Sequence, residues 1–227
     1  MLKKTLYVFL SIVLVAAVAQ AKKNKTARVK DNVATDLKYG WQIKVQDNWK
    51  AKNLKEPSVE RLFMEKKNYL VNPYVETYNG EYTIPRAMIY VQEFSGSVED
   101  FEALIKKSLV EHRSDNAIIS RMGLLRDSEF IISGDVLIDS IPALQVYAKR
   151  NYERLLVIPD RRGFRDDTEK YIKDHEVHEI YLIKKENLIY VFQAYCEREF
   201  YESNADEFQS MIRSFEISPE PIPDPAE

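Results

Sequence analysis

Few of the residues that mark catalytic sites and disulfide scaffolds occur in this 227-residue sequence. Its one cysteine, Cys196, cannot form a disulfide within the chain, so the fold must depend on a buried core. Its six glycines are scattered, which excludes a glycine-rich phosphate loop, and no Gly-x-Ser-x-Gly motif places a serine nucleophile. These absences favour a binding role over catalysis and give no reason to expect a cofactor. Cys196 ends an apolar run and is interpreted as a buried, unreactive thiol.

The longest apolar run lies at the N-terminus, directly after a short basic start. Lys3 and Lys4 precede the apolar stretch 6–18, and Ala19-Gln20-Ala21 has the small-x-small pattern of a cleavage site. The run is shorter than the roughly 20 residues that span a bilayer. The sequence therefore predicts a signal peptide over residues 1–21 and an exported protein, periplasmic or secreted. We expect no stable membrane insertion after cleavage; a retained anchor is the alternative.

Basic residues are in slight deficit. Without Lys3 and Lys4 the 33 Lys and Arg fall to 31, against 36 Asp and Glu, which gives a formal charge of −5. A net negative charge argues against nucleic acid as a partner. We expect the partner to be an envelope protein or a small ligand.

Two polar segments flank one predicted domain. Residues 22–36 are charged and show no periodicity, which predicts a flexible leader. Residues 218–227 contain four prolines, which predict an extended, disordered tail. The remaining residues, 37–217, are numerous enough for a single domain with a real core.

Apolar patterns divide that domain into strands, a helix, further strands and a second helix. Alternation predicts strands at 39–45, 61–66, 86–94, 130–138 and 143–149, and a hairpin of 178–184 with 188–194. Helices are expected after Ser97 and after Ser203, each of which has an aspartate three residues later in capping-box spacing. This order predicts an α+β fold, an antiparallel sheet with helices on its faces.

Three of these segments resemble the PsbP-like family, whose fold is an α/β/α sandwich. The opening Tyr39-Gly40-Trp41-x-Ile43-x-Val45-x-Asp47-x-Trp49 resembles the family's aromatic-glycine first strand and the turn after it. The strand and helix at 89–109, and the hairpin, helix and Ser214-Phe215-Glu216-Ile217 ending, fall where the family has them. The family includes extrinsic subunits of photosystem II, the Ran-binding Mog protein and small exported bacterial proteins. The resemblance implies this fold over residues 37–217 and brings no catalytic motif with it.

The densest group of potential metal ligands is Asp174-His175-Glu176-Val177-His178-Glu179. The second histidine comes one residue too early for a His-Glu-x-x-His zinc motif. In a strand, His175 and His178 would point to opposite faces, whereas in a helix both could reach one ion. Since a strand follows directly, we interpret the group as a solvated charged edge. A weak metal site at His175 and His178, with a metal-dependent activity, is the alternative.

A tyrosine-rich segment is the first of two candidate binding surfaces. Residues 68–85 carry Tyr69, Tyr74, Tyr78 and Tyr82 among Asn, Gly and Pro. Tyrosine-rich loops give contact area at a low cost in conformational entropy. The alternative is that these rings pack against the sheet.

A basic turn is the second candidate, and it lies within a long predicted insertion at 151–177. Arg161, Arg162 and Arg165 surround Gly163, and guanidinium groups bind phosphate and carboxylate groups bidentately. The aspartates that flank this turn favour a self-paired surface loop as the alternative.

We predict that the exported protein begins at Lys22. Mass spectrometry of the protein from the extracytoplasmic fraction should find an N-terminal peptide that starts at Lys22. The double substitution Ala19→Leu, Ala21→Leu should block processing because the cleavage site requires small residues, whereas the control Gln20→Leu should be processed normally. Recovery of intact residues 1–21 in the wild-type extracytoplasmic protein would contradict cleavage.

Overall fold

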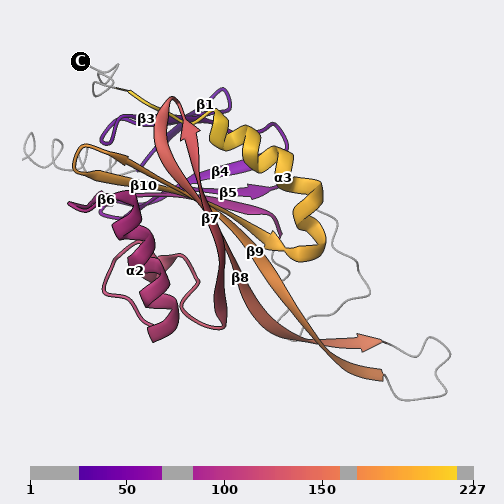
Figure 1. The fold of residues 1–227 in the computed structure, drawn as a ribbon. Helices are drawn as coiled ribbons and strands as arrows, with labels where there is room; N and C mark the ends of the chain where they lie inside the picture. The colour runs from indigo at the N-terminus through magenta and orange to yellow at the C-terminus, as the bar shows by residue number, and fades with distance from the viewer. Residues whose placement is uncertain (1–25, 68–83, 159–167, 219–227) are drawn as a thin grey trace, which may run out of the picture.

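The computed structural model describes residues 26–67, 84–158 and 168–218, and its centre is a seven-stranded antiparallel sheet (Figure 1). In spatial order its strands are β4 (Trp49–Asn53), β5 (Glu60–Lys66), β6 (Arg86–Glu93), β10 (Leu188–Glu197), β9 (Thr168–Lys185), β8 (Ile141–Ile158) and β7 (Ser128–Ile138). The predicted hairpin is the β9–β10 pair, in whose turn Glu186 has a left-handed φ of 53°. The predicted signal peptide and all but Ser218 of the proline-rich tail lie outside the described residues.

A four-stranded sheet, which we did not expect from the sequence, shares a core with the large sheet. Its strands are β1 (Arg28–Lys30), β2 (Val33–Asp36), β3 (Trp41–Lys44) and β11 (Glu216–Ile217), in that order. The expectation of a flexible leader over residues 22–36 is therefore wrong from Thr26 onward. Ala27 and Ala34 are buried in the shared core, and the Thr26 N–H donates to the Leu54 carbonyl at 3.1 Å.

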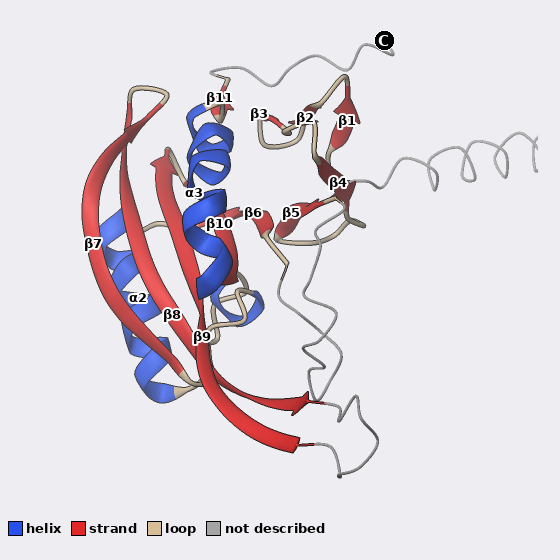
Figure 2. Ribbon diagram, turned by 90° about the vertical axis from the view of Figure 1, so that its right-hand side faces the viewer, coloured by secondary structure: helices blue, strands red, loops and turns tan. Residues whose placement is uncertain are grey.

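Helices α2 (Val98–Glu111) and α3 (Arg198–Arg213) cover opposite faces of the large sheet (Figures 1 and 2). The alternation along β6 shows why both faces need cover. Its odd-numbered apolar residues join the core under α3, whereas Met88 and Tyr90 join the core under α2. This confirms the predicted antiparallel sheet with helices on its faces. No helix among the described residues is long and apolar enough to cross a membrane.

The two helices begin differently. At α2 the Ser97 side chain accepts from the Asp100 N–H at 3.2 Å, and the Asp100 carboxylate accepts from the Ser97 N–H at 2.8 Å, so the predicted capping box is confirmed. The expected cap at Ser203 is wrong. Helix α3 follows β10 directly and begins at Arg198, and the Ser203 hydroxyl donates to the Phe200 carbonyl inside the helix at 3.0 Å.

The far halves of β8 and β9 leave the sheet as a two-stranded ribbon, which we call the β8–β9 arm (Figures 1 and 2). Each strand is 18 residues long. Neighbouring strands β7 and β10 pair with them only as far as Arg150 and Glu176. Beyond these points, residues 151–158 pair with residues 168–175, and no other described strand joins them. The insertion predicted at 151–177 is therefore regular structure in its described parts. The residues before 159 pair with those after 167 and continue the ladder of β8 with β9.

Arg61 ties the two sheets together from a β-bulge in β5. The register of β5 with β6 shifts at Arg61, which makes it the extra residue, and its side chain is fully buried. Its Nε lies 2.7 Å from the Asp36 carboxylate of β2, and one Nη lies 2.5 Å from Glu56. The guanidinium also donates to the backbone carbonyls of Thr26 and Ser58. One cation therefore joins the small sheet, the large sheet and the segment before β1.

We predict that Arg61→Leu lowers the free energy of unfolding by about 3–5 kcal/mol, because it leaves the buried Asp36 carboxylate without its cation. Urea unfolding at pH 7 measures the change. Lys107→Ala serves as the control, since the pair Lys107–Glu111 is exposed and should contribute less than about 1 kcal/mol. A loss for Arg61→Leu no larger than that of the control would contradict the role of this ion pair.

Candidate functional site

Three side chains of β9 are buried where we expected a solvated charged edge. Glu176, His178 and Glu179 are 1%, 2% and 0% exposed. The expectation was wrong because β9 lies between β8 and β10, and the cores under α3 and under α2 cover its two faces. Residues at odd and even positions of a strand point to opposite sides, so two separate polar networks result.

On the face under α2, a chain of polar groups runs from Arg150 to Tyr90. Two nitrogens of Arg150 each lie 2.8 Å from a different oxygen of Glu176. A Glu176 oxygen lies 3.3 Å from Nε2 of His178, and Nδ1 of His178 lies 2.9 Å from the Gln193 amide nitrogen. The Tyr90 hydroxyl donates to the Gln193 side-chain oxygen at 3.0 Å. The chain thus crosses four neighbouring strands of the sheet, β8, β9, β10 and β6.

The hydrogen bonds determine which nitrogen of His178 carries the proton. The Gln193 amide nitrogen also donates to the Met122 carbonyl at 2.9 Å, which identifies it as the donor end of that amide. It therefore donates to Nδ1, and the ring proton sits on Nε2 and points to Glu176. Burial lowers the pKa of His178, although Glu176 opposes the shift. The imidazole is accordingly neutral near pH 7, and both of its nitrogens are in use.

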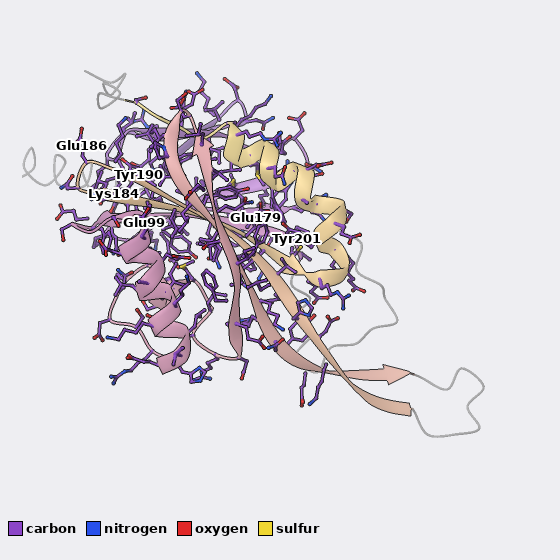
Figure 3. The ribbon with its side chains drawn as sticks, in the orientation of Figure 1. Glu99, Glu179, Lys184, Glu186, Tyr190 and Tyr201 are labelled. Carbon is purple, nitrogen blue, oxygen red and sulfur yellow. The ribbon has the colours of Figure 1, made fainter. Side chains whose placement is uncertain are left out.

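On the face under α3, the buried carboxylate of Glu179 is held by neutral donors. One oxygen accepts from the hydroxyls of Tyr181 at 2.6 Å and Tyr147 at 3.1 Å and from the Gln145 amide at 2.7 Å. The other accepts from the Tyr201 hydroxyl of α3 at 2.9 Å (both residues are labelled in Figure 3). Burial and then the nearby carboxylate raise the pKa of Tyr181 and of Tyr201, so both hydroxyls remain donors. This network fastens the start of α3 to the sheet.

A cleft of about 680 Å³ opens on the same face of the sheet where the β8–β9 arm begins, and we call it the arm-base cleft. The paired residues Asn151 and His175 lie four positions beyond the pair Tyr147–Glu179 along the ladder, a distance of about 13 Å. The cleft is lined by Asp127, Ser128, Glu129, Asn151, Tyr152, Glu153, Lys173, Asp174 and His175.

Negative charge predominates in the arm-base cleft, because four of its lining residues are acidic and one is a lysine. Glu129 lies 3.0 Å from Lys149 and accepts from the Asn151 amide at 2.9 Å, and these contacts lower the pKa of Glu129. The His175 side chain is 26% exposed and lies 3.9 Å from the Asp174 carboxylate. Such a lining suits a ligand that brings positive charge or hydrogen-bond donors.

The structure does not bring His175 and His178 together. They lie on opposite faces of β9, His175 in the arm-base cleft and His178 in the core under α2. Within the described ranges, no group of three or more His, Cys, Asp or Glu is placed to hold a metal ion. The other candidate residues fall outside the described ranges, and their roles stay predictions: Tyr69, Tyr74, Tyr78, Tyr82, Arg161, Arg162 and Arg165.

Both buried networks were missed in the sequence, although a signal for burial was present. Four successive apolar or aromatic residues, 180–183, follow Glu179 directly, and such runs are typical of a strand covered on both faces. Partners such as Gln145 and Tyr201 are remote in sequence from Glu179, so the pattern gave no indication of what would satisfy the carboxylate.

The chain is similar in fold to several solved structures. PsbP (CyanoP) from Synechocystis sp. PCC 6803 is 11% identical, with 82% of this chain and 91% of that chain covered and a TM-score of 0.45. LpqN from Mycobacterium tuberculosis, which is involved in cell envelope biogenesis, is 11% identical over 79% of this chain and 83% of its own, with a TM-score of 0.43. The Ran-binding protein Mog1p of Saccharomyces cerevisiae is 10% identical over 84% and 96%, with a TM-score of 0.44.

These three proteins share the PsbP-like/Mog fold. No family model and no curated protein matches the sequence. The function is therefore argued from the site itself.

We predict that His178 makes the fold less stable as the pH falls below about 6.5, the ordinary pKa of histidine. The pKa of His178 is lowered in the folded state. On acidification the unfolded chain therefore binds a proton at His178 before the folded chain does, and the stabilisation present above that pH is lost. Between pH 7.5 and pH 5.0 the loss from this group is at most about 2 kcal/mol.

The measurement is urea unfolding of the wild type and of His178→Asn at both pH values. Asparagine offers an oxygen where Nδ1 accepts, but it does not titrate. The pH dependence should be shallower in the variant, and identical pH dependences would refute a neutral, buried His178.

Proposed function

We propose that this protein is an exported, non-enzymatic binding or accessory protein, and that the β8–β9 arm and the arm-base cleft form its partner-binding surface. Export is supported by the pattern of residues 1–21. The observation that carries the binding role is the arm. A ladder of eight residue pairs, from Asn151–His175 to Ile158–Thr168, extends beyond the last pairs that β7 and β10 make.

The stability of a two-stranded ribbon supports this proposal. Among the described strands none pairs with the arm, and a ribbon without a third strand or a covering helix is only marginally stable in water. The sequence of β8 there includes four successive apolar residues, 155–158. An apolar sequence on a projecting segment is typical of a surface that another molecule covers.

The arm-base cleft adds charge to that surface. Its carboxylates lie where the arm joins the body, and Glu153 and Lys173, which face the cleft from the arm, have side chains that are 62% and 86% exposed. An arm with an apolar stretch of sequence beside an acidic cleft suits an envelope protein whose contact surface is apolar at its centre and basic at its rim. The tyrosine-rich segment and the basic turn named above are proposed as further parts of the same surface.

No observation among the described residues favours the alternative of a metal site at His175 and His178. The two imidazoles lie on opposite faces of β9, and His178 is enclosed by Glu176, Gln193 and the stacked ring of Tyr195. We therefore propose that the protein binds a partner through charged and apolar contacts at the β8–β9 arm and the arm-base cleft.

Site-specific photo-crosslinking in cells of the source organism tests this proposal. A photoreactive amino acid at Glu153 or Lys173 should give one discrete adduct, because both positions lie at the proposed surface. Placed on α2 it should give none. Suitable positions there are Lys107, whose side chain is 67% exposed, and Val110, which is 81% exposed. Adducts of equal yield from both surfaces, or from α2 alone, would refute the assignment of the binding surface.

A further inference from the structure

Strand β7 forms one edge of the large sheet and pairs, among the described strands, only with β8. Figure 2 shows it at the outer margin of the sheet, with no other described strand along its free side. It is 11 residues long. A free edge of this length offers unpaired N–H and C=O groups to any strand that can approach it.

The strand has few of the features with which natural sheets block an open edge. It contains no lysine, arginine or proline, although a bulge is present at Ile131. Ile131, Ile132 and Leu137 are 53%, 60% and 72% exposed, and among the described residues only two other large hydrophobic side chains are exposed. Exposed apolar area is therefore concentrated on β7, which marks it as an interaction surface.

The apolar pattern of β7 reads the same in both directions about Gly134. Ser133 and Asp135 flank this glycine, and three apolar residues stand at two, three and four positions on either side: Phe130, Ile131, Ile132, Val136, Leu137 and Ile138. A two-fold interface brings the same patch of two copies together, so the patch must complement itself. We propose that two copies of this chain pair antiparallel through β7, with the two-fold axis at Gly134.

In that register Ile132 lies opposite Val136 of the partner subunit on each side of the axis. The bulge at Ile131 ends the regular pairing, which leaves Ile131 and Leu137 at the two margins of the apolar contact. Opposite residues share a face of the sheet, with Cβ atoms about 4.5–5.5 Å apart. Ile132 and Val136 lie on the same face of the sheet, as such a pair requires. Ile132 is aligned with Tyr147, whose hydroxyl contacts Glu179 on the face under α3, and Val136 packs against the core under α3. The two large sheets would meet along residues 132–136 of both copies.

Space on both sides of the axis permits the approach. A Cβ built on Gly134 would meet no atom within 4 Å, so the face of β7 toward which it points is open at the centre of the strand. A hollow of about 550 Å³ lies beside Leu137, between β7 and the start of α2. It gives room for Ile131 of the partner subunit.

A second copy fits this edge better than an extended peptide from another protein. A strand from another protein can pair with β7 whatever the order of apolar residues in β7. A symmetric pattern about Gly134 is needed only when both strands have the same sequence. The register brings Glu129 near Asp139 of the partner subunit at each end. Lys149 offsets this repulsion, since its Nζ lies 3.0 Å from the Glu129 carboxylate.

Sedimentation velocity on the purified protein, up to about 100 µM, tests the proposal within the range of ordinary homodimers. The wild type should sediment as a dimer. Ile132→Lys with Leu137→Lys should raise the dimer dissociation constant at least about 100-fold, because it places unpaired charges in an apolar contact. Val110→Lys, at an exposed apolar position on α2, should leave the dimer unchanged. A monomeric wild type, or a double-lysine variant that still dimerises, would overturn the proposal.

A cysteine at the axis tests the register. In Gly134→Cys the two thiols of the dimer would face each other across the two-fold axis, at a separation that a disulfide can span. Copper-phenanthroline oxidation should yield a covalent dimer, whereas the control Val110→Cys should stay monomeric on a denaturing gel. Cys196 will not interfere because it is fully buried. A dimer in solution that gives no crosslink at position 134 would exclude this register.

Discussion

The ladder between β8 and β9 is the constraint on which the rest of this molecule depends. It runs without interruption over sixteen residue pairs, from Ala143–Ile183 to Ile158–Thr168. One half lies inside the large sheet and the other half projects as the arm (Figure 1). Because the two halves share one register, the residues that line the arm-base cleft are placed by the same hydrogen bonds that build the core.

Because β9 is buried on both faces, the carboxylates that it carries must find hydrogen-bond donors or cations inside the protein. Two of its glutamates lie inside the protein, three residues apart and on opposite faces. Glu176 is neutralised by the two-nitrogen contact with Arg150, whereas Glu179 is solvated by phenol hydroxyls and an amide. Unsatisfied buried carboxylates are costly, so each network constrains the strands and the helix that supply its donors. Both networks lie close to the point where the arm leaves the sheet.

Elements that depend on residues close together in the sequence were predicted correctly. Elements that depend on contacts between distant residues were not. The two covered faces of β6, the capping box at Ser97 and the β9–β10 hairpin each depend on residues within a few positions of one another, and each was correctly predicted. The small sheet was missed because β11 pairs with β3 across most of the chain, as the bond between Gln42 and Glu216 shows.

The candidate site was harder to predict for the same physical reason. A carboxylate in a strand looks solvated until its donors are known, and those of Glu179 come from β8 and α3. The arm resembled a loop because its strands carry charged residues among the apolar ones, as a ribbon without a covering layer can. Only the pairing of 151–158 with 168–175 reveals regular structure there.

The arm also behaves as a ruler with a fixed unit. Each strand advances about 3.4 Å per residue and turns its side chains to alternate faces. Adding or removing two residues in both strands would therefore move the far end by about 7 Å and keep every residue on its face. A change of one residue would instead exchange the faces. The length of the arm can thus vary in discrete steps while the pairing inside the large sheet keeps its register.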